Sequence, residues 1–373
     1  MHALVTGPGG FLGRYIAEQL LARGDTVRGF ARGEYPELVE AGVEMVRGDL
    51  VDRDAVVKAC EGVDCVFHVA GRVGVWGHWF DYFQANVQGT LNLLGACQEV
   101  GVGRLVFTSS PSVTFDAADP ERAHQRGIDE SPRYPKHKYA LHGIQKEAIE
   151  GELSEYPTKW LAHYPHSKAV AEQLVLAENG HRGLRTCSLR PHLVWGPRDT
   201  NLTARLIERA KTGKLRRVGD GQNKVDMVYV ENAAEAHLQA ADALAVGDSA
   251  TESAVAGKAY FLSQGEPVNC WQWIDQLLAL ADLPPVDKSI SATAAYRIGW
   301  LLESAHWWTR RWNAEPRMTR FVARSLSTDH WFDIAAAKRD FGYSPRVSTD
   351  EGMQRLGEWL RQKGKGESKK GKG

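Results

Sequence analysis

The segment TGPGGFLG, residues 6–13, constrains the fold of this chain more than any other stretch of its sequence. It follows an apolar run at His2–Thr6 that favours a β-strand, and it opens a segment with apolar residues at helical spacing. A glycine-rich turn in this context brings the backbone close to a pyrophosphate and aims a helix N-terminus at the anion. The pattern predicts a dinucleotide site that includes Gly7, Gly10, Phe11, Leu12 and Gly13.

Strand and helix patterns alternate beyond this loop. Strands are expected at 26–31, 43–47, 65–69, 104–109 and 184–189, and a helix at about 164–179. This order predicts an α/β fold, with a Rossmann-type doubly wound parallel sheet and a smaller, mostly helical C-terminal lobe. We expect an NAD(P)-binding domain over residues 1–190 onto which 225–245 pack back, a discontinuous substrate lobe over 191–362, and a disordered Lys/Gly tail over 363–373.

The composition is that of an ordinary globular protein and argues against a nucleic-acid-binding or membrane-spanning protein. Formal net charge is zero, apolar residues make up 43% of the chain and charged residues 25%, which is ordinary for a globular domain and gives no basic stripe for nucleic acid. The five cysteines form no C-x-x-C pair, which favours a reduced, cytoplasmic protein without a structural metal. The sequence starts without a secretory signal pattern, and no apolar run is long enough to suggest a membrane span.

The ends of the later strands predict the rest of the cofactor site. An NAD-preferring site usually offers a carboxylate after the second strand, but here Ala31 is followed by Arg32. A guanidinium suits a 2′-phosphate, so we expect NADP(H) to be preferred, with NAD(H) as the alternative. The ends of strands three and four add Asp49 and Leu50 near the adenine, and His68, Ala70 and Gly71 toward the nicotinamide.

Two Tyr-x-x-x-Lys pairs compete for a catalytic role, Tyr134 with Lys138 and Tyr164 with Lys168. At this spacing on a helix, a phenol and an ammonium group lie one turn apart. The segment after Tyr164 is apolar at helical spacing and leads into the buried strand pattern LRTCSLRP, whereas the segment after Tyr134 is polar and leads to no strand. We therefore predict that Tyr164 and Lys168 are the working pair and that 136–157 form an insertion.

With these elements in place, the chain resembles the extended short-chain dehydrogenase/reductase family. TGPGGFLG, ANVQGTLNLL, TSSPSV, YPHSK and RPHLVWGPRD carry the resemblance. Within that family it resembles the 3β-hydroxysteroid dehydrogenase and sterol-4-carboxylate 3-dehydrogenase group, and most of all the bacterial 2-alkyl-3-oxoalkanoate reductases of olefin biosynthesis. The resemblance implies Tyr164 as general acid/base, Lys168 as the group that lowers its pKa and holds the nicotinamide ribose, Ser110 as a hydrogen-bond partner of the substrate oxygen, Asn86 as a support near Lys168, and cofactor contacts from Pro191 and Leu193.

Aromatic segments point to the substrate. Trp76 and its aromatic neighbours follow the fourth strand, and four tryptophans lie within residues 300–312 beside two arginines. This favours a bulky, lipophilic substrate such as a 2-alkyl-3-oxoalkanoate or a 3β-hydroxysteroid, with peripheral membrane contact as a further hypothesis. The family resemblance suggests a homodimer. A nucleotide-sugar epimerase or dehydratase and a non-catalytic dinucleotide sensor remain the alternatives.

Overall fold

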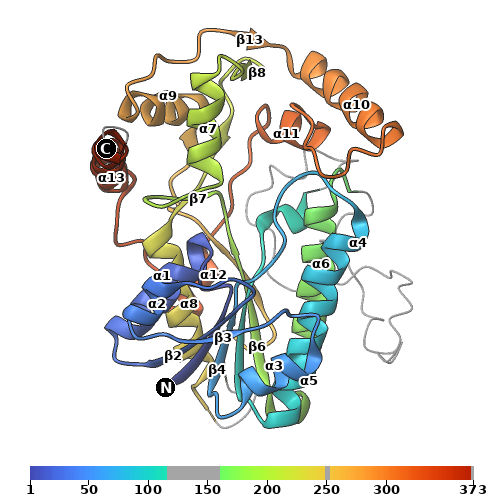
Figure 1. Cartoon of the computed structure of the whole chain (residues 1–373), viewed down its shortest axis with the longest axis vertical. Coiled ribbons are helices and arrows are strands. Elements are labelled where there is room, and N and C mark those ends of the chain that lie inside the picture. Colours follow the sequence, from blue (N-terminus) through green and yellow to red (C-terminus); the bar gives the residue numbers. More distant parts are fainter. Residues whose placement is uncertain (116–159, 248–252, 371–373) are drawn as a thin grey trace.

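The computed structural model describes residues 1–115, 160–247 and 253–370. Its centre is a seven-stranded, fully parallel sheet in the order β3-β2-β1-β4-β5-β6-β11 (Figure 1). The predicted doubly wound α/β fold is thereby confirmed. The strands are β1 (His2–Thr6), β2 (Thr26–Ala31), β3 (Glu44–Arg47), β4 (Cys65–His68), β5 (Arg104–Thr108), β6 (Arg185–Pro191) and β11 (Ala259–Leu262).

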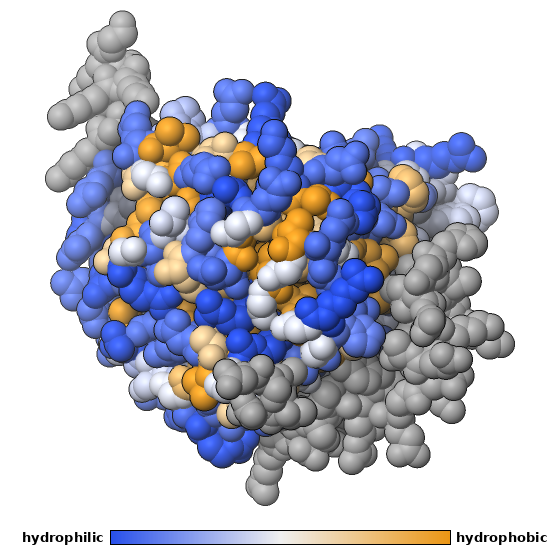
Figure 2. All heavy atoms as spheres, turned by 90° about the horizontal axis from the view of Figure 1, so that it is seen from below, coloured by the Kyte–Doolittle hydropathy of each residue, from blue (hydrophilic) through white to orange (hydrophobic). Residues whose placement is uncertain are grey.

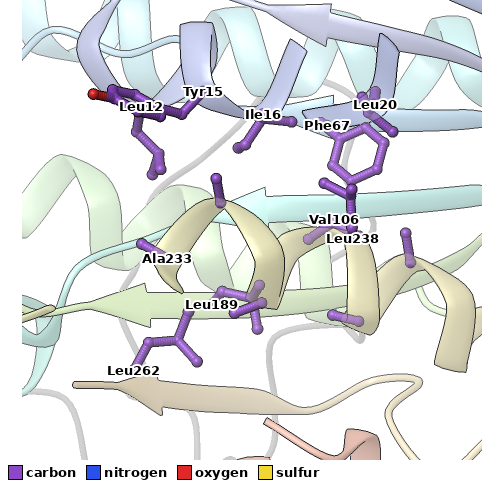
Figure 3. Packing of buried hydrophobic residues seen from close by; sticks show 14 of the residues in the cluster. Leu12, Tyr15, Ile16, Leu20, Phe67, Val106, Leu189, Ala233, Leu238 and Leu262 are labelled. Carbon is purple, nitrogen blue, oxygen red and sulfur yellow. The ribbon is translucent and has the colours of Figure 1, made fainter. Parts of the chain in front are cut away.

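Helices cover both faces of this sheet. Their buried aliphatic faces form two separate clusters with the strands, one on each side. Figure 3 shows the first cluster, in which Ile16 and Leu20 lie opposite Leu238. The first face carries α1 (Phe11–Ala22), α8 (Val230–Leu244) and α12 (Ala335–Phe341), the second α3 (Arg53–Cys60), α5 (Gly89–Val100) and α6 (His163–Ala177), and α2 (Pro36–Glu40) lies before β3.

A second lobe stands beyond the carboxyl ends of the strands (Figure 1). Its own core is built around the buried tryptophans Trp195, Trp271 and Trp273. Three short strand pairs join β7 (Val194–Trp195) to β10 (Val228–Tyr229), β8 (Arg217–Val218) to β13 (Ser289–Ile290), and β9 (Lys224–Val225) to β12 (Val268–Asn269). Its helices are α7 (Leu202–Lys211), α9 (Cys270–Leu280), α10 (Ala292–Trp308), α11 (Arg320–Ser325) and α13 (Thr349–Lys370).

Short helices connect β4 and β5 to the following elements. They are α4 (Trp79–Tyr82), the π-helix η1 (Phe83–Gln88) and the 3₁₀ turn η2 (Pro111–Thr114), with a further 3₁₀ turn, η5, at His181–Gly183.

Two sequence expectations differ from the structure. We had expected residues 191–362, apart from 225–245, to form the substrate lobe, but β11 within this range pairs in parallel with β6 and extends the main sheet. We had expected 363–373 to be disordered, but α13 continues to Lys370. Its first turns are packed through Met353 and Leu356 against the lobe, which anchors the helix. The insertion at 136–157, with Tyr134 nearby, lies outside the described residues.

Among the residues that the structure describes, no helix combines the length and apolar character needed to cross a bilayer. The same part of the chain contains no cluster of His, Cys, Asp or Glu side chains arranged to hold a metal ion.

Candidate functional site

A cavity of about 850 Å³ opens at the carboxyl edge of the sheet. It reaches across β1 and β4, where the strand order reverses and open α/β sheets usually bind their ligands. Most of the sequence-predicted residues meet here. The cavity is lined by Gly7, Gly10, Phe11, Leu12, Gly13, Arg32, Asp49, Leu50, Ala70, Gly71, Tyr164 and Lys168, whereas His68, Asn86, Ser110, Pro191 and Leu193 are absent from its lining.

The glycine loop forms a cradle that side chains would fill. A Cβ on Gly13 would lie 2.3 Å from the Gly7 carbonyl oxygen, and Gly7 itself has a left-handed φ of +68°. A Cβ on Gly9 would lie 2.1 Å from the ring of Tyr35, which covers the loop from beyond β2. Helix α1 starts without a side-chain cap, so its first N–H groups remain available to an anion. These features fit the pyrophosphate of a dinucleotide.

Tyr164 lines the cavity and contacts Ser110, which lies outside the lining. Burial raises the pKa of Tyr164 above its ordinary range, and a hydrogen bond with Ser110 opposes this shift. The Ser110 hydroxyl also lies 2.9 Å from the Ser112 hydroxyl and caps the turn η2. Pro111 begins that turn, where a missing N–H has no cost. Ser110 can therefore orient the phenol although it is absent from the cavity lining.

Lys168 lies one turn further along α6 and is buried. Its ammonium group donates a hydrogen bond to the Thr108 carbonyl and stands 4.1 Å from the centre of the Phe107 ring. Burial lowers the pKa of Lys168 to about 7, and the Glu172 carboxylate opposes this shift. We had expected Lys168 to lower the pKa of Tyr164, but burial, Ser110 and Tyr82 are the causes of the tyrosine shift in this arrangement. The ammonium group is directed toward the end of β5 instead.

Asn86 supports this centre from the π-helix η1. Its amide donates to the Ser167 hydroxyl at 2.8 Å and to the Arg72 carbonyl at 3.0 Å, and its carbonyl accepts from the Arg72 N–H. A Cβ placed on Gly71 would lie 3.1 Å from Asn86 Oδ1 and 3.8 Å from Lys168 Nζ. Asn86 therefore joins the segment after β4 to α6 beside Lys168, and a π-helix is a frequent feature of functional sites.

His68 lies beneath the cavity. The Thr6 hydroxyl oxygen accepts from the Ala70 N–H at 3.1 Å, so its own proton points to His68 Nδ1, 2.9 Å away. His68 Nε2 then donates to the Thr90 hydroxyl at 2.9 Å, which in turn donates to the Asn86 carbonyl. This chain needs a neutral imidazole, and burial lowers the pKa of His68 to about 3. We had predicted that His68 contacts the cofactor. Instead, it orients the Thr6 hydroxyl, which in turn holds the Ala70 N–H at the start of the turn after β4.

The end of β6 holds a buried histidine cluster. His192 Nδ1 lies 2.6 Å from an Asp226 carboxylate oxygen, and its Nε2 lies 3.2 Å from His330 Nδ1. His330 Nε2 donates to a backbone carbonyl at 2.8 Å. The cluster ties the sheet to two segments of the second lobe. Pro191 ends β6, and Leu193 has a left-handed φ of +42°. Both residues were predicted to contact the cofactor, but they lie on either side of His192 in the chain and outside the cavity lining, whereas Val194 lines the cavity.

Arg32, which we had expected to favour NADP(H), lies in the lining of the cavity. The Arg32 side chain is 82% exposed and its guanidinium stands 3.8 Å from an Asp49 carboxylate oxygen. Its neighbour Arg47 instead pairs with Glu34 at 3.0 Å. Arg32 is therefore free to turn its fork toward an incoming phosphate.

Sequence analysis missed a buried ion pair behind Lys168. Glu172 accepts hydrogen bonds from the Arg190 guanidinium at 2.6 to 3.2 Å and from the Ser188 hydroxyl at 2.7 Å. Both charged side chains are almost fully buried. The sequence does place a carboxylate four residues after Lys168 on an otherwise apolar helix face, and this position could have indicated a buried ion pair. Tyr35, Asp199 and Asn201 also line the cavity without having been predicted.

Three buried neutral histidines predict acid lability. Burial lowers the pKa of His68 to about 3 and those of His237 and His330 to about 4, whereas an unfolded histidine titrates near 6.5. Below about pH 6.5 the unfolded chain binds more protons, so stability falls as the pH falls toward 4. At pH 5.5 we expect a loss of up to about 4 kcal/mol relative to pH 7.5, measured by urea unfolding. Uptake of fewer than about one proton on unfolding in this window would contradict the assignment.

Known proteins with similar sequences identify the family of this chain. The model of the 3-beta hydroxysteroid dehydrogenase/isomerase family matches residues 4–151 and 141–286. The chain belongs to this family. It is an oxidoreductase of the extended short-chain dehydrogenase/reductase type with an NAD(P)-binding Rossmann fold. A 2-alkyl-3-oxoalkanoate reductase of Stenotrophomonas maltophilia is 47% identical over 95% of the chain and 98% of its own length, and one of Shewanella oneidensis is 44% identical over 95% and 85%.

Other relatives and solved structures extend this family picture. A 3beta-hydroxysteroid-dehydrogenase/decarboxylase of Arabidopsis thaliana is 34% identical over 94% of the chain and 78% of its own length. The UDP-glucose 4-epimerase of Thermus thermophilus, solved with NAD, superposes with a TM-score of 0.66 at 24% identity, covering 97% of this chain and 99% of its own. That likeness shows the fold alone.

Proposed function

We propose that this enzyme reduces the ketone of a 2-alkyl-3-oxoalkanoate to a secondary alcohol, with NADP(H) as the preferred cofactor. The observation that carries the proposal is the identity of 47% and 44%, over 95% of the chain, to two reductases of that name. The presence of Tyr164 and Lys168 in the cavity lining, with Ser110 hydrogen-bonded to Tyr164, supports it. Three relatives named as 3β-hydroxysteroid enzymes are 34%, 34% and 30% identical, which makes a 3β-hydroxysteroid the second candidate.

The side chains divide the work of ketone reduction. When bound in this cavity, a reduced nicotinamide would supply the hydride for the carbonyl carbon. The Tyr164 hydroxyl donates its proton to the carbonyl oxygen, and its raised pKa keeps the phenol protonated before the reaction. Ser110 orients the phenol and the substrate oxygen. Lys168, with a pKa of about 7, holds a positive charge for part of the time at neutral pH beside this centre.

The substrate assignment is tested by following oxidation of NADPH and NADH by the purified enzyme. We expect turnover with a 2-alkyl-3-oxoalkanoate, and much slower turnover with a 3-ketosteroid. Faster turnover with the 3-ketosteroid would move the assignment to the sterol class. A tightly held, non-exchanging NAD with conversion of UDP-glucose would support an epimerase instead, and cofactor binding without any turnover would support a sensor.

Arg32→Ala is expected to weaken use of NADPH selectively. A charge-assisted contact to the 2′-phosphate is worth about a ten- to a hundredfold in kcat/KM, whereas NADH has no group for Arg32 to bind. The measurement is kcat/KM for both cofactors. Arg53→Ala is the matched control, because Arg53 is exposed, pairs with Glu99 and lies outside the cavity lining. An equal loss for both cofactors in Arg32→Ala would contradict the NADP(H) preference.

Two broader expectations are kept as proposals. The five cysteines are free and buried, which supports a reducing, cytoplasmic location. The family resemblance supports a homodimer, which light scattering on the purified enzyme would test.

A further inference from the structure

Helix α10 presents an apolar face to solvent. Its exposed apolar side chains lie on the half of the helix opposite the buried residues Ala295, Gly299 and Glu303, and two pairs of them recur seven residues, or about two turns, apart. Large apolar residues this exposed and this close together are unusual on a folded domain and mark interaction sites. The exposed fractions are 40% for Ile298, 53% for Trp300, 58% for Leu301, 56% for Trp307 and 79% for Trp308.

The opposite face of α10 fixes this orientation. A Cβ on Gly299 would lie 2.7 Å from the Arg320 backbone nitrogen, so only glycine allows α10 to approach the start of α11 this closely. Glu303 is buried on the same face and accepts hydrogen bonds at 2.6 Å from both the Arg320 N–H and its guanidinium. Rotating α10 to bury the tryptophans would break the Glu303–Arg320 ion pair and separate Gly299 from the start of α11. Their exposure is therefore a feature of the packed helix.

Positive charge flanks the apolar face. Arg297 lies one turn before Leu301 on the exposed side, and Arg310 and Arg311 directly follow the last turn. Within the described part of the chain, none of these three guanidinium groups forms an ion pair with a carboxylate. Exposed tryptophan between unneutralised arginines matches the layering of an anionic bilayer, with an apolar interior beneath negatively charged headgroups.

The apolar face adjoins the entrance of the cavity. The Trp76 indole donates to the Arg311 carbonyl at 3.0 Å and stacks on Trp312 at 5.7 Å between ring centres. Trp76 lies in the same segment as Val69 and Val73, which both line the cavity. Val73 is 58% exposed, so this part of the lining is open to solvent. Figure 1 accordingly shows α10 on the same side of the molecule as α4. Figure 2 shows the end of the molecule that lies at the bottom of Figure 1, where apolar patches are interspersed with hydrophilic residues.

We propose that α10 docks this enzyme on the surface of an anionic bilayer, with Trp300, Leu301 and Trp308 in the headgroup layer and Arg297 and Arg311 on lipid phosphates. The docked face lies beside the cavity entrance, so a lipophilic substrate would pass from the bilayer toward Tyr164 without crossing water. That purpose rests on the function proposed above. The docking itself rests only on the exposed aromatic face and its arginines.

The test is co-sedimentation of the full-length protein with phosphatidylcholine vesicles, with and without phosphatidylglycerol. We expect binding to the anionic vesicles that weakens as salt is raised. The double variant Trp300→Ser/Trp308→Ser should lower the partition coefficient by at least about tenfold. The double variant Arg297→Gln/Arg311→Gln should lower it by about fivefold per charge on anionic vesicles only.

The controls separate docking from folding, dimerisation and catalysis. Val39→Ser/Val246→Ser removes two exposed apolar side chains outside α10 and should bind as the wild type does. Equal partition of the wild type and the tryptophan variant would overturn the proposal. So would a dimer that the tryptophan variant converts to a monomer without any vesicle binding, because the face would then belong to a second copy. Turnover on a short-chain, water-soluble substrate is measured separately, so loss of the proposed activity is distinguishable from loss of docking.

Discussion

Tyr164→Phe is expected to lower kcat for ketone reduction by about 10²- to 10⁴-fold, because the substrate oxygen loses its proton donor. Cofactor affinity should change little, since we expect the glycine loop and Arg32, which line the same cavity, to hold most of the dinucleotide. The measurements are steady-state turnover with the preferred substrate and equilibrium titration of NADPH. The fold of the variant should survive, because a phenyl ring fills the same space and only the hydrogen bond with Ser110 is lost.

Tyr134→Phe is the matched control for this prediction. Tyr134 has a lysine four residues later, as Tyr164 does, but it lies outside the described residues, and its following segment leads to no strand pattern. This variant should retain nearly full activity. Loss of activity in Tyr134→Phe, with activity kept in Tyr164→Phe, would show that the wrong pair was chosen.

The sheet was predictable because its strands carry local signals. The expected strands at 2–6 and 26–31 have the observed bounds, and the others among the first five differ by one residue at one end. The seventh strand was not recognised as part of this sheet. Ala259–Leu262 is a four-residue apolar run that pairs with β6 about seventy residues earlier in the chain, and no local pattern shows which sheet a short strand joins.

The cavity residues were predictable to the extent that strand ends imply position. Gly7, Arg32 and Ala70 follow different strands and meet because parallel strands share one carboxyl edge. The direction of a side chain was harder to predict. His68 ends β4, but both faces of a parallel sheet are buried, so the sequence does not show whether its ring points to the cavity or into the core. Hydrogen bonds between distant segments, such as Asn86 with Ser167, also have no local signature.

Breaking the ion pair behind Lys168 is expected to destabilise the fold strongly. Arg190→Met removes the guanidinium from Glu172, whose carboxylate is fully buried, and Glu172→Gln removes the charge from the other side. Each single variant should lose about 3 to 5 kcal/mol in the free energy of urea unfolding, because one buried charge loses its partner. The double variant Glu172→Gln/Arg190→Met should lose less than the sum of the two, and an additive result would contradict a direct pairing.

The same variants separate a structural role from a positioning role for Glu172. The carboxylate raises the pKa of Lys168, against the lowering that burial causes. If protonated Lys168 supports the reaction, activity falls as the pH rises through its pKa, and removal of the Glu172 charge shifts this fall to lower pH. We therefore expect Glu172→Gln to move the alkaline limb of the kcat profile toward acid, at temperatures where the variant is fully folded. A profile identical to that of the wild type would mean that the Glu172–Arg190 pair only holds α6 against β6.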